Sequence, residues 1–258
     1  HTVLFPEIDG NFPNHHPDPT VEKYMTQLSA KVVESAFEAG LGLDGDADRI
    51  GVVDEHGKML FGDQILNILA RDYLKSNQGK AIIADVKCSK NLYDDIRKHG
   101  GTPIMYKTGH ANIKMRMKEI GVDFAGEMSG HVFLADRYLG FDDAIYVSCR
   151  FVEVMSSTTA PVSSYLADQP KMYNTPELHI KCTDEAKFEV VAKVCAEFQA
   201  EGYDVNDIDG ARITFEDGWG LVRASNTTPV LVTRFEATSE ARMLEIQQLI
   251  EGKIGKYI

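Results

Sequence analysis

The stretch Ala81-Ile82-Ile83-Ala84-Asp85-Val86 decides the fold of this chain, because it is a short apolar run that leads into the polar residues that follow it. Its length and composition predict a buried strand. Apolar residues at helical spacing predict helices before and after it, at residues 63–74 and 92–99, and a second strand at residues 103–106. Helix, strand, helix, strand in this order predicts a parallel sheet.

The alternation continues toward both ends of this region. Before it, we expect a strand at residues 3–5, a helix at 21–39 closed by Gly40, and a hairpin of 41–43 with 50–53. After it, helices are expected at residues 113–120 and 142–155, around short segments at 124–126 and 132–134.

The Ser/Thr-rich stretch at residues 156–161 is the best boundary signal, although the junction can lie nearer Pro170. The pattern then changes to strands at residues 178–182, 213–215, 221–224 and 230–236, with helices at 185–200 and 239–250. We therefore expect an α/β chain of mixed-sheet domains followed by a smaller α+β domain at the C-terminus.

Charge, hydropathy and cysteine content argue against several kinds of partner and location. The 258 residues carry 27 Lys and Arg against 39 Asp and Glu, a net charge of −12, which disfavours nucleic acid and acidic membranes as partners. No apolar run approaches the roughly 18 residues of a membrane-spanning helix. The four cysteines are far apart and form no Cys-x-x-Cys pair, so we expect reduced, mostly buried thiols in a cytoplasmic protein.

The stretch Asp44-Gly45-Asp46-Ala47-Asp48-Arg49 places three carboxylates at alternate positions between two apolar runs. Carboxylates this close repel one another, and a hard divalent cation with oxygen ligands compensates for that repulsion. The sequence therefore predicts a Mg²⁺ or Ca²⁺ site, with a solvated acidic turn as the alternative.

A second polar group lies in Gly126-Glu127-Met128-Ser129-Gly130-His131. If this segment is extended, Glu127, Ser129 and His131 point to one side, because alternate residues of a strand share a face. A carboxylate, a hydroxyl and an imidazole together suit the hydroxyls of a sugar ring. The alternative is a polar strand edge followed by a turn.

Polar residues also follow the expected strands elsewhere. Lys87 and His110 come after two neighbouring strands, at the sheet edge where open α/β sheets bind ligands. The stretch Arg223-Ala224-Ser225-Asn226-Thr227-Thr228-Pro229 combines a guanidinium with hydroxyls and backbone N–H groups, which suits a phosphate group. The alternatives are a solvated lysine, a histidine at a helix start and an ordinary Ser/Thr turn.

Taken together, these motifs resemble those of the bacterial phosphomannomutase/phosphoglucomutase family in the α-D-phosphohexomutase superfamily. The resemblance rests on residues 44–49 as the metal loop, 126–131 as the sugar loop and 223–228 as the phosphate loop. Residues 9–19 are similar to the stretch that precedes the metal loop in this family. The order of the four motifs is that of the family, and the resemblance runs from end to end.

The resemblance implies three parts: residues 1–58 as the C-terminal part of domain 2, 59–168 as domain 3, and 169–258 as domain 4. It also implies reversible phosphoryl transfer between C1 and C6 of glucose and mannose phosphates, through a phosphoserine and a 1,6-bisphosphate. Asp44, Asp46 and Asp48 would hold Mg²⁺. Arg49, Lys87, His110 and His131 would be catalytic, and Glu127 with Ser129 would hold the sugar. Arg223, Ser225, Asn226, Thr227 and Thr228 would hold the phosphate that does not react.

One part of the family pattern is missing. No Thr-Ala-Ser-His-Asn-Pro-like loop, which carries the catalytic serine in this family, occurs in the 258 residues. We therefore expect a fragment that lacks an N-terminal domain of the same enzyme as its partner, and that is inactive alone. Two alternatives are a non-catalytic sugar-phosphate-binding fragment or regulator, and an EF-hand-like calcium module starting at Asp44. The sequence leaves the choice between mannose and glucose open.

Overall fold

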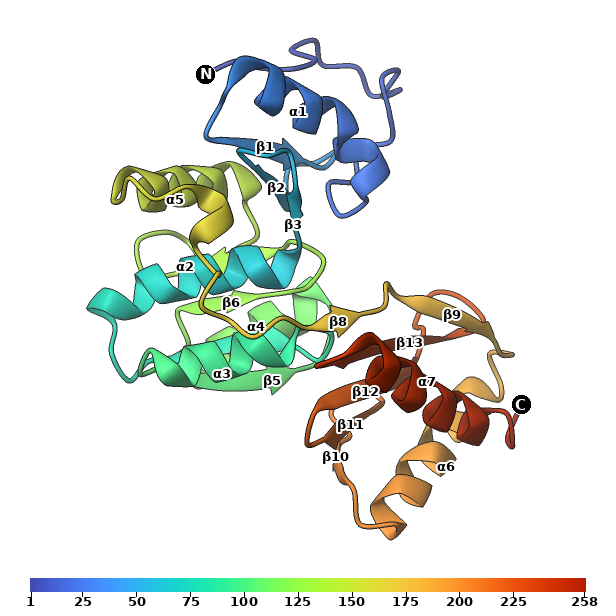
Figure 1. Cartoon of the computed structure of the whole chain (residues 1–258). Coiled ribbons are helices and arrows are strands. Elements are labelled where there is room, and N and C mark those ends of the chain that lie inside the picture. The colour runs from blue at the N-terminus through green and yellow to red at the C-terminus, as the bar shows by residue number, and fades with distance from the viewer. The chain divides into compact units, whose positions relative to one another are not determined.

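The computed structural model describes residues 1–258, and these divide into two compact units. The first unit comprises residues 1–105 and 109–169, and the second comprises residues 106–108 and 170–258 (Figure 1). Each unit has a hydrophobic core of its own. The two units are therefore described separately.

The first unit begins with a helix on a small antiparallel sheet. Helix α1 (Glu22–Ser35) packs against β1 (Ala39–Leu43), β2 (Ile50–Asp54) and β3 (Met59–Leu60). Strand β2 pairs antiparallel with both β1 and β3. Leu43 lies opposite Ile50, so the acidic stretch 44–49 is the connection of the hairpin. The predicted hairpin is confirmed.

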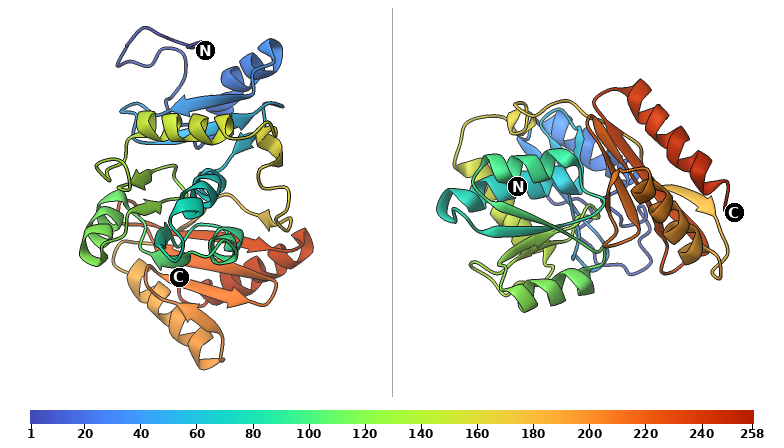
Figure 2. Two further views of the ribbon diagram at one scale, coloured as in Figure 1. Left: turned by 90° about the vertical axis from the view of Figure 1, so that its left-hand side faces the viewer. Right: turned by 90° about the horizontal axis from the view of Figure 1, so that it is seen from below.

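The larger sheet of the first unit has the strand order β5-β4-β6-β7. Its strands are β4 (Ala81–Asp85), β5 (Thr102–Tyr106), β6 (Phe124–Gly126) and β7 (Val132–Leu134). Its helices are α2 (Gly62–Ser76), α3 (Lys90–Lys98) and α4 (His110–Ile120), with α2 and α3 on one face and α4 on the other (Figure 2). Strands β4 and β6 are parallel, whereas β6 and β7 are antiparallel, so the sheet is mixed.

Helix α5 (Ala144–Ser156) joins the two sheets of the first unit. It packs against α2, β1, β2 and β7, and the 3₁₀ turn η1 (Val162–Ser164) follows it. Asp143 caps its first turn by accepting a hydrogen bond from the Tyr146 N–H at 2.9 Å. Phe151 on this helix is fully buried, in the same core as Phe124 and Leu66. The hairpin and the larger sheet therefore share one core.

The second unit is an antiparallel sheet covered by two helices. Strands β10 to β13 pair in order, and β8 and β9 both pair with β13. The elements are β8 (Tyr173–Asn174), β9 (Leu178–Lys181), α6 (Lys187–Ala200), β10 (Asp204–Asn206), β11 (Ala211–Phe215), β12 (Gly218–Ala224), β13 (Val230–Ala237) and α7 (Glu240–Ile254). Alternate strand residues such as Ile213, Val222 and Phe235 are buried with residues of both helices. The predicted fold class, α/β followed by a smaller α+β part, is confirmed.

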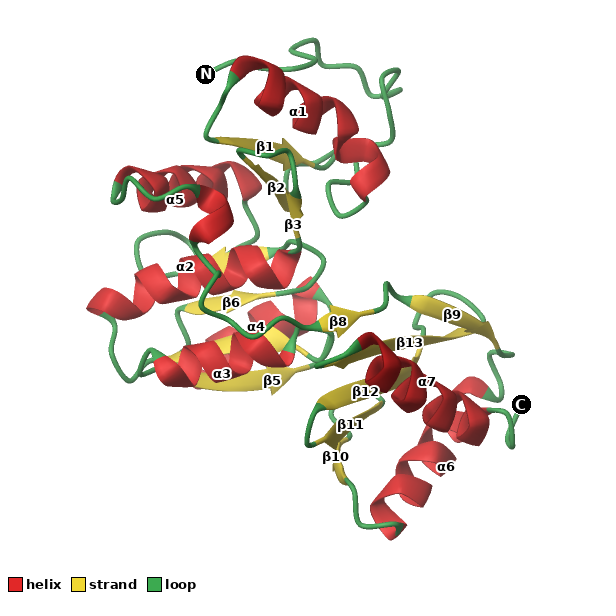
Figure 3. Cartoon of the chain, in the orientation of Figure 1, coloured by secondary structure: helices red, strands yellow, loops and turns green.

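Two predicted elements are wrong. Residues 3–5 form no strand: they lie in the N-terminal loop, and Phe5 has a φ of 53°, which an extended strand does not contain (Figure 3). Helix α1 ends at Ser35 and not at Gly40, because Ala36 takes the left-handed conformation and its N–H closes the last turn on Val32 and Val33. Gly40 lies in β1 instead.

Two further predictions concerned buried, reduced thiols and the lack of a membrane-spanning helix. All four cysteines are free, but only Cys88 and Cys182 are buried, while Cys195 is intermediate and Cys149 exposed. The expectation of mostly buried thiols is therefore only half correct. None of the helices combines the length and the apolar character that crossing a membrane requires.

Candidate active site

The acidic connection between β1 and β2 is a tight, hydrogen-bonded turn. One carboxylate oxygen of Asp44 accepts hydrogen bonds from the backbone N–H groups of Asp48 and Arg49, both at 3.0 Å. Ala47 completes the turn with a φ of 59°. One oxygen from each of Asp44, Asp46 and Asp48 lies within 4.8 Å of the others. The turn therefore gathers three carboxylates in one place.

The electrostatics of this turn fit a divalent cation. The Arg49 Nε donates to Asp44 at 2.7 Å, and hydrogen bonds from Arg49 lower the pKa of Asp44 although burial opposes this. The pKa of Asp48, in contrast, is raised. Burial is the largest cause, and the negative charges of the neighbouring Asp44 and Asp46 add to it. A set of hard oxygen ligands with excess negative charge suits Mg²⁺. The EF-hand alternative is wrong, because strands and not helices flank the turn.

The sugar-loop segment is a turn and not an extended strand. The Gly130 N–H donates to the Glu127 carbonyl at 3.1 Å, the Glu127 N–H donates to the His131 carbonyl at 2.9 Å, and Gly130 has a φ of 91°. The predicted extended geometry is thus wrong, since a glycine with positive φ reverses the chain there. The three side chains still converge: His131 Nδ1 lies 2.9 Å from Ser129 Oγ and 3.3 Å from a Glu127 oxygen.

Backbone contacts join the metal loop to the sugar loop. Residues Arg49 and His131 form an isolated antiparallel bridge, and the Ile50 N–H donates to the Gly130 carbonyl at 3.1 Å. As a result, His131 Nε2 lies 3.3 Å from an Asp48 oxygen. Two segments that are far apart in the sequence are therefore held as one site by their backbones.

Glu127 and His131 form the buried centre of this site. Glu127 is 1% exposed, and it accepts a hydrogen bond from the Gly109 N–H at 2.6 Å. Burial opposes protonation of His131, but the carboxylates of Glu127, Asp48 and Asp142 together raise its pKa. His131 can therefore take up a proton readily and share it with neighbouring oxygens.

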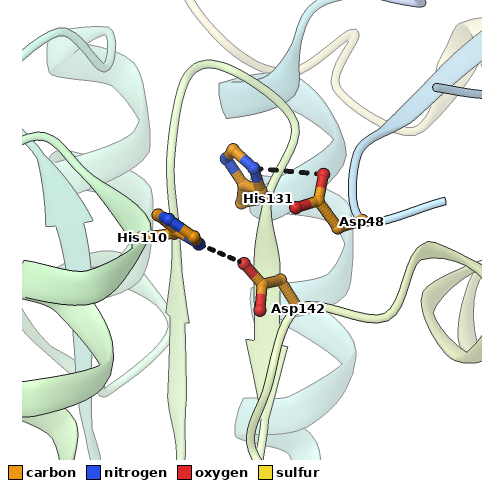
Figure 4. Close-up of side chains that lie close together, drawn as sticks. All are labelled: Asp48, His110, His131 and Asp142. Atoms are coloured by element: carbon orange, nitrogen blue, oxygen red, sulfur yellow. Dashed lines mark hydrogen bonds and ion pairs between the residues drawn. The ribbon is translucent and has the colours of Figure 1, made fainter. Parts of the chain in front are cut away.

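Sequence reasoning missed Asp142, which lies just before α5. One of its oxygens is 2.9 Å from His110 Nδ1, and the other accepts a hydrogen bond from Lys114 Nζ at 2.7 Å. The rings of His110 and His131 stack with centroids 5.5 Å apart, so Asp48, His131, His110 and Asp142 form one cluster (Figure 4). The two adjacent carboxylates at residues 142 and 143 could have indicated this role. A helix start needs only one carboxylate as its cap, which left the other available for the site.

Lys87 and Asp85 lie at the end of β4. Lys87 is 7% exposed, and its Nζ lies 4.0 Å from a carboxylate oxygen of Asp85. Asp85 is fully buried and accepts hydrogen bonds from the Met128 N–H at 3.2 Å and the Cys88 thiol at 3.1 Å. Burial raises the pKa of Asp85. This carboxylate, which sequence reasoning did not select, therefore links the lysine to the sugar loop.

The phosphate loop belongs to the second unit, where it connects β12 to β13. Ser225 Oγ accepts hydrogen bonds from the N–H groups of Thr227 at 3.3 Å and Thr228 at 3.2 Å, and Asn226 to Thr228 are exposed. Arg223 Nε donates to Asp209 at 3.1 Å. Asp209 was also missed in the sequence, because an Asp-Gly pair between two strands is ordinary turn chemistry.

Sequence models of the phosphoglucomutase/phosphomannomutase family match three consecutive parts of the chain. The alpha/beta/alpha domain II matches residues 3–57, the alpha/beta/alpha domain III matches residues 61–173, and the C-terminal domain matches residues 177–253. The chain belongs to the phosphoglucomutase/phosphomannomutase family.

Individual members of the phosphoglucomutase/phosphomannomutase family are similar to nearly the whole of this chain. The phosphomannomutase/phosphoglucomutase of Pseudomonas syringae is 46% identical over 98% of this chain and 54% of its own length. A phosphoglucomutase of Neisseria gonorrhoeae is 45% identical over 98% of this chain and 55% of its own length. A crystal structure of a family protein from Burkholderia thailandensis has a TM-score of 0.91 and 42% identity, and covers 98% of this chain and 54% of that chain. The chain spans about half the length of these family relatives.

Proposed function

We propose that this chain forms the metal-binding, sugar-binding and phosphate-binding parts of a phosphohexomutase. The reaction is reversible phosphoryl transfer between C1 and C6 of glucose and mannose phosphates. The observation that carries the proposal is the backbone link from Ile50 to Gly130, which brings the three-aspartate turn against Glu127, Ser129 and His131. Membership of the family supports the same activity.

The charged residues of the first unit suit phosphoryl transfer, which depends mainly on placement and charge neutralisation. Asp44, Asp46 and Asp48 would hold Mg²⁺, and this ion would supply positive charge to a phosphoryl oxygen. Arg49 is anchored by Asp44 through its Nε at 2.7 Å and more weakly by Asp18 through one terminal nitrogen at 3.5 Å, so its other terminal nitrogen can face a phosphoryl group. Lys87 would add a second protein cation.

The sugar hydroxyls need acceptors and a group that takes a proton. Glu127 and Ser129 would accept hydrogen bonds from ring hydroxyls, and their contacts with His131 hold that imidazole in place. When a sugar hydroxyl attacks phosphorus, its proton has to leave as the new P–O bond forms and the old one breaks. His131 and His110 are the candidate proton carriers, since both lie beside carboxylates.

The loop of the second unit would grip the phosphate that is not reacting. Arg223 offers a planar fork of N–H groups, and Ser225, Asn226, Thr227 and Thr228 offer hydroxyls, an amide and backbone donors. The exposed position of residues 226–228 leaves these donors accessible to a ligand. The sugar loop contacts hydroxyls other than that at C2 in this proposal, so we expect both glucose and mannose phosphates to bind.

The phosphoryl donor is the one component that these residues do not include. None of the serines of the chain lies in a loop of the phosphoserine type, so the donor in this proposal is a serine of the same enzyme outside the 258 residues. The same observation favours a second candidate, a non-catalytic protein that only binds sugar phosphates. Four free cysteines support a reducing, cytoplasmic location.

Calorimetric titration of the chain with glucose 1-phosphate, glucose 6-phosphate and mannose 6-phosphate in the presence of Mg²⁺ tests the binding proposal. We expect each ligand to bind, and Glu127→Ala and Arg223→Ala to weaken binding. The chain alone should produce no glucose 6-phosphate from glucose 1-phosphate in a coupled assay. Absence of binding by the folded chain, or turnover without a phosphoserine donor, would contradict the proposal.

A further inference from the structure

The cluster of Asp48, His110, His131 and Asp142 has the composition of a transition-metal site (Figure 4). One ligand atom from each residue lies within 4.8 Å of the other three. Two imidazoles with two carboxylates suit borderline ions such as Zn²⁺ and Co²⁺, whereas Mg²⁺ prefers oxygen ligands alone. We propose that this cluster is a second cation site, which binds a transition-metal dication and shares Asp48 with the acidic turn.

The distances fit such an ion. Metal–ligand bonds of about 2.0–2.2 Å in a tetrahedron place the ligand atoms roughly 3.3–3.6 Å apart. His131 Nε2 lies 3.3 Å from the Asp48 oxygen, and His110 Nδ1 lies 2.9 Å from the Asp142 oxygen. The first pair therefore already has the required spacing, whereas the second pair has to open by a few tenths of an ångström. All four ligand atoms lie within 4.8 Å of one another, so small movements of the side chains bring them to tetrahedral spacing.

The surroundings of His131 are those of a metal-bound imidazole. Its Nε2 faces Asp48, while its Nδ1 faces Ser129 Oγ at 2.9 Å and a Glu127 oxygen at 3.3 Å. Histidines that bind metals usually donate their second ring N–H to a carboxylate, which fixes the tautomer and increases the basicity of the coordinating nitrogen. The buried Glu127 provides that carboxylate here.

The local charge also favours a dication. The two aspartates of the cluster bring two negative charges, and Glu127 behind His131 adds a third. Two cations oppose them: Lys114 Nζ donates to one oxygen of Asp142 at 2.7 Å and lies 3.4 Å from His110 Nδ1, and Arg49 Nε lies 4.0 Å from an Asp48 oxygen. The other oxygen of Asp142 is the one that faces His110, so Lys114 orients this ligand without occupying it. The cluster therefore keeps excess negative charge, which attracts a dication.

Sharing of Asp48 connects this site to the acidic turn. Asp48 belongs both to the three-aspartate group and to the histidine cluster. An ion bound by both histidines would occupy the nitrogen lone pairs with which they accept protons, so in the proposed phosphohexomutase reaction the loaded form would be inactive. This last consequence rests on the proposed function, whereas the site itself does not.

Cobalt binding to the whole chain tests the site without any turnover, so it separates this proposal from the proposed function. We expect added Co²⁺ to give visible absorption of the tetrahedral type, which Zn²⁺ abolishes by displacing it from the histidine cluster. His110→Ala and Asp142→Asn should each weaken binding about tenfold or more. His110 has a half-exposed side chain, and far-UV circular dichroism of both variants verifies that they are folded.

Two matched variants locate the ion. His179→Ala removes an exposed histidine of the second unit and should leave cobalt binding unchanged. Asp46→Asn removes a carboxylate of the acidic turn that is outside the cluster and should leave the tetrahedral absorption of bound Co²⁺ unchanged. The proposal is overturned if Co²⁺ gives no tetrahedral absorption, if folded His110→Ala and Asp142→Asn give the same absorption as the parent, or if only Asp46→Asn abolishes it.

Discussion

Replacement of Gly130 by alanine tests the link between the metal loop and the sugar loop. Gly130 has a φ of 91°, and a Cβ at this position would lie 2.6 Å from the carbonyl oxygen of Ile50. The left-handed backbone costs an alanine about 1–2 kcal/mol, and overpacking against backbone atoms costs about 1–3 kcal/mol more. We therefore expect Gly130→Ala to lower the free energy of unfolding of the first unit by about 2–5 kcal/mol.

Gly121→Ala is the matched control for this prediction. Gly121 also has a positive φ, 67°, but a Cβ there would meet no atom within 4 Å. It should therefore cost only the backbone strain, about 1–2 kcal/mol. If Gly130→Ala lowers the free energy of unfolding by more than Gly121→Ala does, we assign the difference to the contact with Ile50. Ile50 is the residue that joins the two loops.

Urea unfolding followed by two probes provides the measurement. Trp219 is the only tryptophan and lies in the second unit, so its fluorescence reports that unit, while far-UV circular dichroism reports both. Gly130→Ala should shift the dichroism transition of the first unit and leave the Trp219 transition in place. Equal destabilisation by Gly130→Ala and Gly121→Ala would refute the reasoning, because it would show that the contact with Ile50 costs nothing.

Two further predictions concern carboxylates that pair with cations. Asp209→Asn removes the charge that pairs with Arg223 Nε at 3.1 Å. Calorimetry should therefore show that inorganic phosphate binds the second unit roughly threefold more tightly. Weaker binding would show instead that Asp209 only positions the arginine. Lys98 and Arg71 lower the pKa of Asp168 to about 2, and this half-exposed pair network contributes about 0.5–1 kcal/mol after solvent screening. Because the folded pKa is lowered, this contribution is complete above the ordinary pKa of about 3.9 and is lost as pH falls through about 2. The difference in unfolding free energy between the parent and Asp168→Asn should therefore shrink from pH 5 toward pH 2, and a constant difference would contradict this assignment.

Local patterns in the sequence were sufficient to predict most of the fold. Apolar residues at helical or strand spacing predicted the hairpin around the acidic turn, the strand β4 and the helices of both units. Short strands such as β3 and β10 were missed, because two or three residues carry too little periodicity. The strand expected at residues 3–5 is absent, because apolar composition alone does not provide a partner strand.

The site was predictable only in part, for a physical reason. Asp44, Asp46 and Asp48 gather locally on one turn, so their spacing in the sequence showed the cluster. Asp142 and Lys114 meet His110 only through the tertiary fold. The sugar loop was also predicted only in part. Polar residues at alternate positions suggested a strand with the side chains on one face, whereas the positive φ of Gly130 makes a turn, and the side chains meet across this turn.

A chimera tests the central proposal most directly. In it, this chain replaces the aligned part of the Pseudomonas syringae relative, and the rest of that relative is kept. We predict that the purified chimera converts glucose 1-phosphate to glucose 6-phosphate in the presence of Mg²⁺, and that Asp46→Asn and Glu127→Ala strongly reduce the rate. A folded chimera that binds glucose 1-phosphate but does not convert it would contradict the account.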